Sequence, residues 1–370
     1  MTASKIPAET ITVHVDDRAA TRQQVFIDLT HLGRHVTGLE RVSIEQFQNM
    51  DFADADVRYV TANGIASMIW HQQVVLPLLA LLNPRATFVF PGFPPAPMFA
   101  LMPSRVVMYV HDLFLLTRPA DLGLKAKLYM APSFGIAVRR LKRFLVNSEK
   151  TRAELQPFAR RDAEIALYRP LVRNVFGLET TGREDRAQHP GVLKIATLGT
   201  IEPRKNYGAM LPILDALAAR GQPAELHVIG REGWGAAREA LAGDPRVTIH
   251  GYQPAGAVKA LLEAADVYLC CSHDEGLGLP LLEAQFAGLP VAAPGSAVFR
   301  EVLGQSGTFI DPADATGAAT AIAALIAVPG WRGRSCAAAR ANAARWNDLA
   351  SADAGLARHM FAQKALARRA

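Results

Sequence analysis

The chain has little cysteine: three residues among 370, of which Cys270 and Cys271 are adjacent. Cysteines so placed cannot form a disulfide framework, and no Cys/His spacing resembles a zinc site. The most apolar stretch, 74–82, is nine residues long and contains Pro77, well short of the ~20 residues that span a bilayer. The first residues also lack the apolar core of a signal peptide. These absences predict a cytoplasmic protein with no membrane-spanning helix.

Charged residues are also sparse, at 20% of the chain, while hydrophobic residues make up 50%. This balance favours a globular protein over a disordered one. The net charge of +6 is compatible with an anionic ligand, a polyanion or an acidic membrane surface. A length of 370 residues corresponds to two domains that share a cleft.

Short, continuously apolar segments alternate with longer helical patterns, which is typical of buried parallel strands and their crossover helices. These segments are 25–29, 87–90, 106–110, 143–147, 193–198, 225–229, 247–249, 267–269 and 290–293. The polar stretch 169–191 interrupts the rhythm. We therefore predict an α/β protein with two doubly wound, Rossmann-like domains facing across a cleft. The predicted parts are residues 1–175, a linker at 176–191, residues 192–340, and a helix at 341–370 that packs back on the first domain.

The most informative segment is 272–284, which reads SHDEGLGLPLLEA and follows a predicted strand. A glycine loop that enters a helix, with Pro280 in its first turn, presents backbone N–H groups to an anion. Glu275 and Glu283 lie in the same segment, and carboxylates beside a phosphate cost free energy. We therefore expect both to bind hydroxyl groups. The alternative is structural: Glu275 caps the helix and Glu283 is a solvated acid of its first turn.

This segment, with its continuation EAQFAGLPV at 283–291, resembles the signature of the group 1 glycosyltransferases, the retaining family 4 with the GT-B fold. The resemblance implies that Glu275 binds hydroxyls of the donor sugar and takes part in catalysis, and that Glu283 binds the ribose. It also implies donor contacts from the residues between the two glutamates: Gly276, Leu277, Gly278 and Leu279.

A second segment, LGTIEPRKN at 198–206, resembles the family loop that holds the donor diphosphate. The resemblance assigns this role to Arg204 and Lys205. Fixed cations stabilise the charge that grows on a departing diphosphate. Thr200 occupies a donor-side position where many members have arginine, and Arg231 is a candidate substitute. The alternative for the loop is an ordinary exposed basic turn.

The resemblance is nearly continuous over 195–312, and Gly251 with Tyr252 matches the segment that meets the nucleobase. In the first half, His111 within VHDL resembles the family histidine beside the donor sugar, and we treat it as a second catalytic candidate. Thr37 and Gly38 resemble a glycine loop near the donor phosphate or the acceptor, although Glu40 replaces its second glycine.

The basic segment Arg139–Arg143 is either a solvated face or a site that docks on anionic lipid. Many members of the family glycosylate lipid-linked acceptors, which favours the inner face of the plasma membrane as a location.

Together these features predict a retaining, metal-independent hexosyltransferase without a bound cofactor, resembling bacterial mannosyltransferases. Its partners are expected to be a nucleotide-sugar donor, with GDP-mannose favoured, and a saccharide or lipid-linked acceptor; nucleic acid is not expected. Two alternatives stay open: an inactive GT-B subunit that binds a nucleotide sugar or a partner transferase, and a nucleotide-sugar epimerase.

Overall fold

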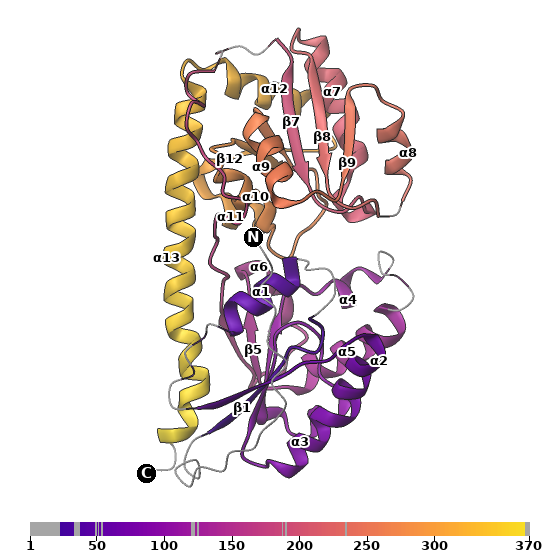
Figure 1. The fold of residues 1–370 in the computed structure, drawn as a ribbon, viewed down its shortest axis with the longest axis vertical. Coiled ribbons are helices and arrows are strands. Elements are labelled where there is room, and N and C mark those ends of the chain that lie inside the picture. Colours follow the sequence, from indigo (N-terminus) through magenta and orange to yellow (C-terminus); the bar gives the residue numbers. More distant parts are fainter. Residues whose placement is uncertain are drawn as a thin grey trace.

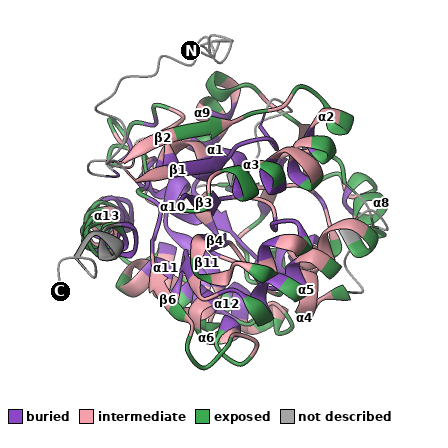
Figure 2. Ribbon diagram, turned by 90° about the horizontal axis from the view of Figure 1, so that it is seen from below, coloured by how far each residue is buried: buried purple, intermediate pink, exposed green. Residues whose placement is uncertain are grey.

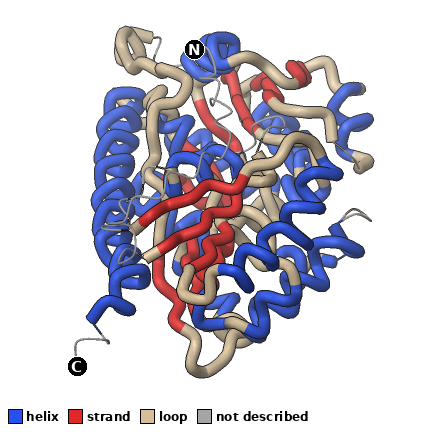
Figure 3. Tube along the Cα trace, turned by 60° about the horizontal axis from the view of Figure 1, so that its bottom comes forward, coloured by secondary structure: helices blue, strands red, loops and turns tan. Residues whose placement is uncertain are grey.

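The computed structural model describes residues 23–32, 38–48, 50, 52, 55–119, 123, 126–186, 188, 191–233 and 235–366. Within these residues the chain forms two six-stranded sheets, one from each half of the sequence (Figures 1 and 3). All the strand pairs are parallel. The predicted α/β class with two doubly wound sheets is confirmed.

The first sheet has the order β2-β1-β3-β4-β5-β6. Its strands are β1 (Gln24–Asp28), β2 (Asp56–Val60), β3 (Thr87–Phe90), β4 (Val106–Val110), β5 (Arg143–Val146) and β6 (Glu164–Leu167). The order reverses beside β1, so the loops after β1, β3 and β4 meet at one edge of this sheet.

The second sheet has the order β12-β11-β10-β7-β8-β9. Its strands are β7 (Leu193–Leu198), β8 (Ala224–Ile229), β9 (Val247–Gly251), β10 (Val267–Leu269), β11 (Val291–Pro294) and β12 (Gly307–Ile310). Here the order reverses between β7 and β10. In doubly wound sheets, ligands bind outside the carboxyl ends of the strands at that point.

Three strands were not predicted from the sequence: β2, β6 and β12. All three lie at a sheet edge. Residues of β2 and β6 are only partly buried or exposed, and an edge strand that faces water tolerates residues such as Arg58 and Glu164. Such strands lack the continuous apolar pattern that identifies the central ones.

Helices cover both sheets. The carboxyl ends of the strands in one sheet face those of the other. In the first half they are α1 (Gly38–Phe47), α2 (Ile65–Trp70), η2 (His71–Val75), α3 (Leu76–Leu82), η3 (Pro97–Leu101), η4 (Pro103–Arg105), α4 (Phe114–Thr117), η6 (Ala126–Met130), α5 (Ala131–Arg140) and α6 (Glu149–Leu155). In the second they are η7 (Pro203–Lys205), η8 (Tyr207–Ala209), α7 (Met210–Ala219), α8 (Ala237–Ala242), α9 (Ala255–Ala264), α10 (Leu279–Gln285), α11 (Ala297–Leu303), η9 (Gly304–Ser306) and α12 (Ala315–Ala327).

The last helix, α13 (Trp331–Leu366), runs along both halves of the molecule (Figure 1). It begins at Trp331 rather than at the predicted residue 341, because the helix continues through the Ala-rich stretch before that position. Near its C-terminal end, Met360 O accepts a hydrogen bond from Arg143 Nη1 at 2.9 Å, and Phe361 packs edge-on against Phe52. The helix thus connects the second sheet to the core of the first.

A buried ion-pair cluster also joins the two halves. Arg169, in the segment between the sheets, pairs with Glu301 of α11 at 3.0 Å and with Asp353 of α13 at 2.7 Å. Glu301 also accepts hydrogen bonds from the backbone N–H groups of Glu149 and Lys150 at the start of α6. A carboxylate at a helix N-terminus stabilises that terminus. One residue of the second half therefore caps a helix of the first.

Candidate functional site

The loops after β7 and β10 meet at the reversal point of the second sheet, and three predicted site residues lie together there. Arg204 Nη1 and Lys205 Nζ, both in η7, donate to Glu275 Oε2 and Oε1, each at 2.6 Å. Ser272 Oγ donates to Glu275 Oε1 at 2.9 Å. Two separate sequence motifs therefore converge on one carboxylate.

This carboxylate is buried and ionised. Burial alone would raise the pKa of Glu275, but the charges and hydrogen bonds of Lys205 and Arg204 outweigh burial and lower it to about 2. Arg204 is held further by Glu202 Oε1 at 2.5 Å and by the carbonyl of Asp274 at 2.8 Å. The site therefore holds two cations in fixed positions around an anion.

The next residue of the loop, Gly276, lies directly against the first domain. A Cβ atom on Gly276 would lie 2.4 Å from the carbonyl oxygen of His111 and 3.0 Å from Asp112 Cβ. Ser148 Oγ, at the end of β5, donates to Gly276 O at 3.0 Å. Only a residue without a side chain fits between these two backbones.

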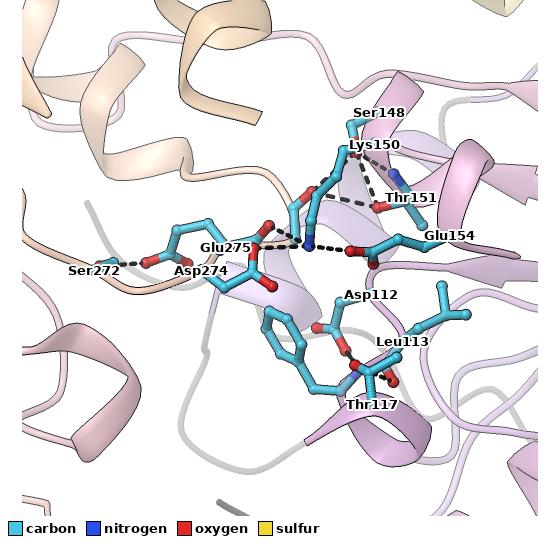
Figure 4. A network of polar contacts seen from close by, with 12 residues as sticks. Asp112, Leu113, Thr117, Ser148, Lys150, Thr151, Glu154, Ser272, Asp274 and Glu275 are labelled. Atoms are coloured by element: carbon cyan, nitrogen blue, oxygen red, sulfur yellow. Dashed lines mark hydrogen bonds and ion pairs between the residues drawn. The ribbon is translucent and has the colours of Figure 1, made fainter. Parts of the chain in front are cut away.

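Lys150 of α6 completes the contact between the domains (Figure 4). Its Nζ donates to Glu275 O at 3.2 Å and pairs with Asp274 Oδ1 at 2.8 Å and Glu154 Oε1 at 3.1 Å. The Phe114 ring lies beneath both Lys150 Nζ, at 5.2 Å, and Arg204 Cζ, at 5.1 Å. Lys150 is not among the residues predicted from the sequence; the available signal is its position just after the end of a strand beside the one that carries His111.

His111, at the end of β4, has a defined hydrogen-bonding pattern. Its Nε2 lies 2.7 Å from Pro91 O, and burial lowers its pKa to about 4. The ring is therefore neutral at pH 7, with Nε2–H donating to Pro91 and Nδ1 left as an acceptor. In this geometry His111 can accept a hydrogen bond from a hydroxyl group but carries no charge to offset a phosphate.

Glu283, in α10, forms an ion pair across the domains with Arg41 of α1. Burial raises the pKa of Glu283, and the Arg41 charge opposes that rise. The pair lines a recess with Leu279 and Pro170. Gly38 is the first residue of α1 and so lies on the helix that supplies Arg41, whereas Thr37 lies outside the described residues.

The second half of the chain is similar in sequence to a known protein family. Residues 192–327 match the family described as glycosyl transferases group 1. This part of the chain, less than half of its length, is similar to that family. It is 30% identical over 141 residues to O-antigen chain mannosyltransferase B of Escherichia coli, covering 36% of this chain and 37% of that protein. It is 34% identical over 132 residues to a phosphatidyl-myo-inositol mannosyltransferase of Mycolicibacterium smegmatis, covering 34% and 33%. The matches span about a third of the length of these relatives.

Solved structures extend the likeness to the whole fold. Anabaena HepE in complex with UDP and glucose superposes with a TM-score of 0.64 at 15% identity, covering 92% of this chain and 99% of that one. WaaG, a glycosyltransferase involved in lipopolysaccharide biosynthesis, gives 0.61 at 16% identity, covering 91% and 99%. The chain therefore has the GT-B fold, and its second half is similar to the group 1 glycosyltransferase family.

Residues between the two glutamates shape the loop of the second domain. Leu277 is buried in the second-domain core, and Leu279 packs against the cores of both domains. Gly278 precedes α10 with φ 86°, a left-handed conformation that suits glycine. The two leucine side chains and the left-handed Gly278 therefore fix the path of the backbone past Glu275.

The remaining predicted donor residues of the second domain lie at the ends of β7, β8 and β9. Arg231 Cζ lies 5.3 Å from the centre of the exposed Tyr252 ring, just after Gly251. Thr200 Cγ2 lies 2.7 Å from the place a Cβ on Gly233 would occupy, so Thr200 packs against the backbone of the β8 loop. Arg231 is thus stacked on Tyr252 rather than joined to the Arg204–Glu275 cluster.

Proposed function

We propose that the chain is a retaining glycosyltransferase of family 4 that transfers a hexose from a nucleotide-sugar donor to an acceptor hydroxyl. The observation that carries the proposal is the convergence of Arg204 and Lys205 on Glu275, within contact of the first domain at His111. Breaking the bond between sugar and diphosphate leaves charge on the diphosphate. Fixed cations in a site shielded from water stabilise that charge most as the bond breaks.

Each residue then has a defined role. Arg204 and Lys205 bind the diphosphate, and the ionised Glu275 accepts hydrogen bonds from donor-sugar hydroxyls. Glu283 binds the ribose, which requires its pair with Arg41 to be shared or opened. His111 accepts a hydrogen bond from a hydroxyl of the reacting sugar. Support for a nucleobase site at Tyr252 comes from its exposed ring at the end of β9.

In the reaction we propose, the acceptor hydroxyl attacks from the face that the diphosphate leaves, and a phosphate oxygen takes the hydroxyl proton. Because the cations are side chains, no metal ion and no cofactor is assigned a role.

We favour GDP-mannose as donor because the two relatives reported above are mannosyltransferases; the UDP complex of HepE makes a UDP-sugar the main competitor. We propose a saccharide or lipid-linked acceptor and a cytoplasmic location, peripheral on the inner face of the plasma membrane.

The test begins with thermal stabilisation by a panel of nucleotide sugars, since a ligand that binds the native state raises the melting temperature. Donor hydrolysis is then compared for wild type and Glu275→Ala, with and without a chelator, and the product anomer is read by NMR. Turnover in wild type that falls sharply in Glu275→Ala, survives chelation and retains configuration supports the proposal. Donor binding without turnover indicates an inactive subunit, and a product that keeps its diphosphate indicates an epimerase.

A further inference from the structure

The positive charge of the chain is concentrated in one segment. Residues 61–148 contain nine Lys and Arg but only two acidic residues, Asp112 and Asp121, a net charge of +7. The whole chain carries +6, so the rest of the protein has a net charge of −1. The net positive charge of the whole chain therefore comes from the part of the first domain that contains α2, α3, α4 and α5.

The same segment exposes large apolar side chains. The continuous helical run Ile65–Leu82 has 18 residues, a mean hydropathy of 1.6 and no charged residue. Trp70 is 59% exposed and Leu82 is 72% exposed, and Figure 2 shows exposed segments along α2, α3 and α5. Further exposed apolar residues of the segment are Ile65, Ile69, Leu78, Leu81, Leu101, Leu128 and Ile136.

These residues belong to adjoining elements. Tyr129 of η6 donates to Gln72 Oε1 at 3.0 Å, which joins η6 and the following α5 to η2. Arg105 of η4 donates to Ala80 O and Asn83 O at the end of α3. Since η4 directly follows η3, Leu101 lies near that end of α3. The exposed apolar residues therefore border one connected region of the first domain.

By length and composition the run Ile65–Leu82 could cross a membrane, yet its contacts assign it to a surface. Leu76 and Ala80 are fully buried in the first-domain core. Gln72 is also buried and donates to Thr30 Oγ1, which in turn donates to Asp28. Spanning a bilayer would strip these core contacts and leave a glutamine in hydrocarbon, whereas lying in the interface preserves them.

Cations border the apolar residues. Arg85 follows α3, Lys127 lies in η6, and Arg139 and Arg140 end α5; all four are exposed and form no ion pair with a described residue. Of the basic segment predicted from the sequence, Lys142 instead pairs with Asp162 at 2.7 Å. Between α4 and α5 an open groove of about 490 Å³ is lined by Leu116, Pro132 and Ile136, with both terminal arginines at its edge.

We propose that this region is the surface by which the protein docks on an anionic lipid bilayer. The docking face comprises the exposed apolar residues of Ile65–Leu82, with Leu101, Leu128 and Ile136, together with Arg85, Lys127, Arg139 and Arg140. Tryptophan and leucine enter the headgroup boundary, and the arginines contact lipid phosphates. The charge excess and the lack of acidic residues favour an anionic membrane over a protein partner. Only the role of docking rests on the proposed function: docking would present a lipid-linked acceptor to the cleft.

The experiment measures binding of the purified full chain to vesicles of phosphatidylcholine with and without phosphatidylglycerol, at low and high salt. One variant combines Trp70→Ser, Leu81→Ser and Leu82→Ser. A second combines Arg85→Gln, Arg139→Gln and Arg140→Gln. Its matched control removes three exposed arginines elsewhere, Arg161→Gln, Arg220→Gln and Arg334→Gln. The apolar control is Leu349→Ser with Leu356→Ser on α13.

Wild type is expected to bind only the vesicles with phosphatidylglycerol and to be released by salt. Each cation near the surface contributes about fivefold, so the triple arginine variant should bind on the order of a hundredfold more weakly. The apolar variant should lose binding, and both controls should keep it. Equal binding to both vesicles, no binding, or equal loss in the controls would overturn the proposal. So would a dimer in solution that the apolar variant dissociates. Donor hydrolysis in the docking variants separates failed docking from a wrong assignment of function.

Discussion

Replacing Gly276 with alanine is the sharpest test of the contact between the domains. The added Cβ would lie 2.4 Å from the His111 carbonyl oxygen, whereas ordinary contacts of this kind begin near 3.4 Å. Both atoms belong to backbone, so neither can swing aside as a flexible side chain would. The two segments must separate by about 1 Å to accept the methyl group.

The expected consequence is large for activity and small for stability. A displacement of about 1 Å at reacting groups can cost about 100-fold in rate. Glu275 directly precedes Gly276, so its carboxylate and the paired Arg204 would shift relative to His111. Gly276 itself contributes no side chain to the core of either domain. We therefore expect kcat/KM for donor turnover to fall about 100-fold, with little change in the melting temperature.

The matched control is Gly256→Ala in α9, where a Cβ would meet nothing within 4 Å. Alanine there should keep wild-type activity and add slightly to stability, because it favours helix more than glycine does. Steady-state donor turnover and thermal unfolding of the three proteins decide the matter. Wild-type kcat/KM in Gly276→Ala would show that donor turnover occurs in a domain arrangement that lacks this contact.

Three further substitutions test other parts of the structure. Lys205→Ala removes a charged hydrogen-bond donor and should weaken nucleotide-sugar binding about 10-fold or more by calorimetry; unchanged affinity would refute its phosphate role. Arg169→Met leaves Asp353 without its cation and should lower the free energy of unfolding by about 3–5 kcal/mol in denaturant titrations, while adding Asp353→Asn should recover part of the loss; full stability in the single variant would contradict this. Burial raises the pKa of Asp28 from 3.8 to about 6, so its ionisation costs stability as the pH rises through that window and costs nothing below it. Asp28→Asn should therefore stabilise by up to about 3 kcal/mol near pH 8 and by little near pH 4, and an equal effect at both would argue against the titration.

The central strands could be predicted because both their faces are buried. Segments such as 106–110 and 193–198 are continuously apolar, and the strands there have the predicted bounds. The edge strand β2, by contrast, pairs on one side only and contains Asp56 and Arg58. Its identity as a strand depends on pairing with β1, which local sequence does not reveal.

The candidate site likewise has features that local sequence predicts and features that depend on the topology. The loops of Arg204 and Glu275 could be located because their glycine and proline positions are local signals. That the two side chains pair with each other depends on β7 and β10 being neighbours, which follows from the topology. Lys150 was missed for the same reason: its partners in the second domain, Asp274 and Glu275, are more than a hundred residues away in sequence.

The three consecutive residues 274–276 explain why domain contact and cation placement are one property of this site. Asp274 pairs with Lys150 of the first domain, Gly276 lies against its backbone at His111, and between them Glu275 holds the second-domain cations. One carboxylate oxygen receives Arg204 and the other receives Lys205 and Ser272. Under the proposed function, a diphosphate meets cations that are already desolvated and positioned, so little reorganisation is needed when it binds. Because the ion pairs with Glu275 also compete with the diphosphate for both cations, that preorganisation limits affinity in the ground state. The two cations stabilise the diphosphate most in the transition state, where the leaving diphosphate carries more charge than the bound donor.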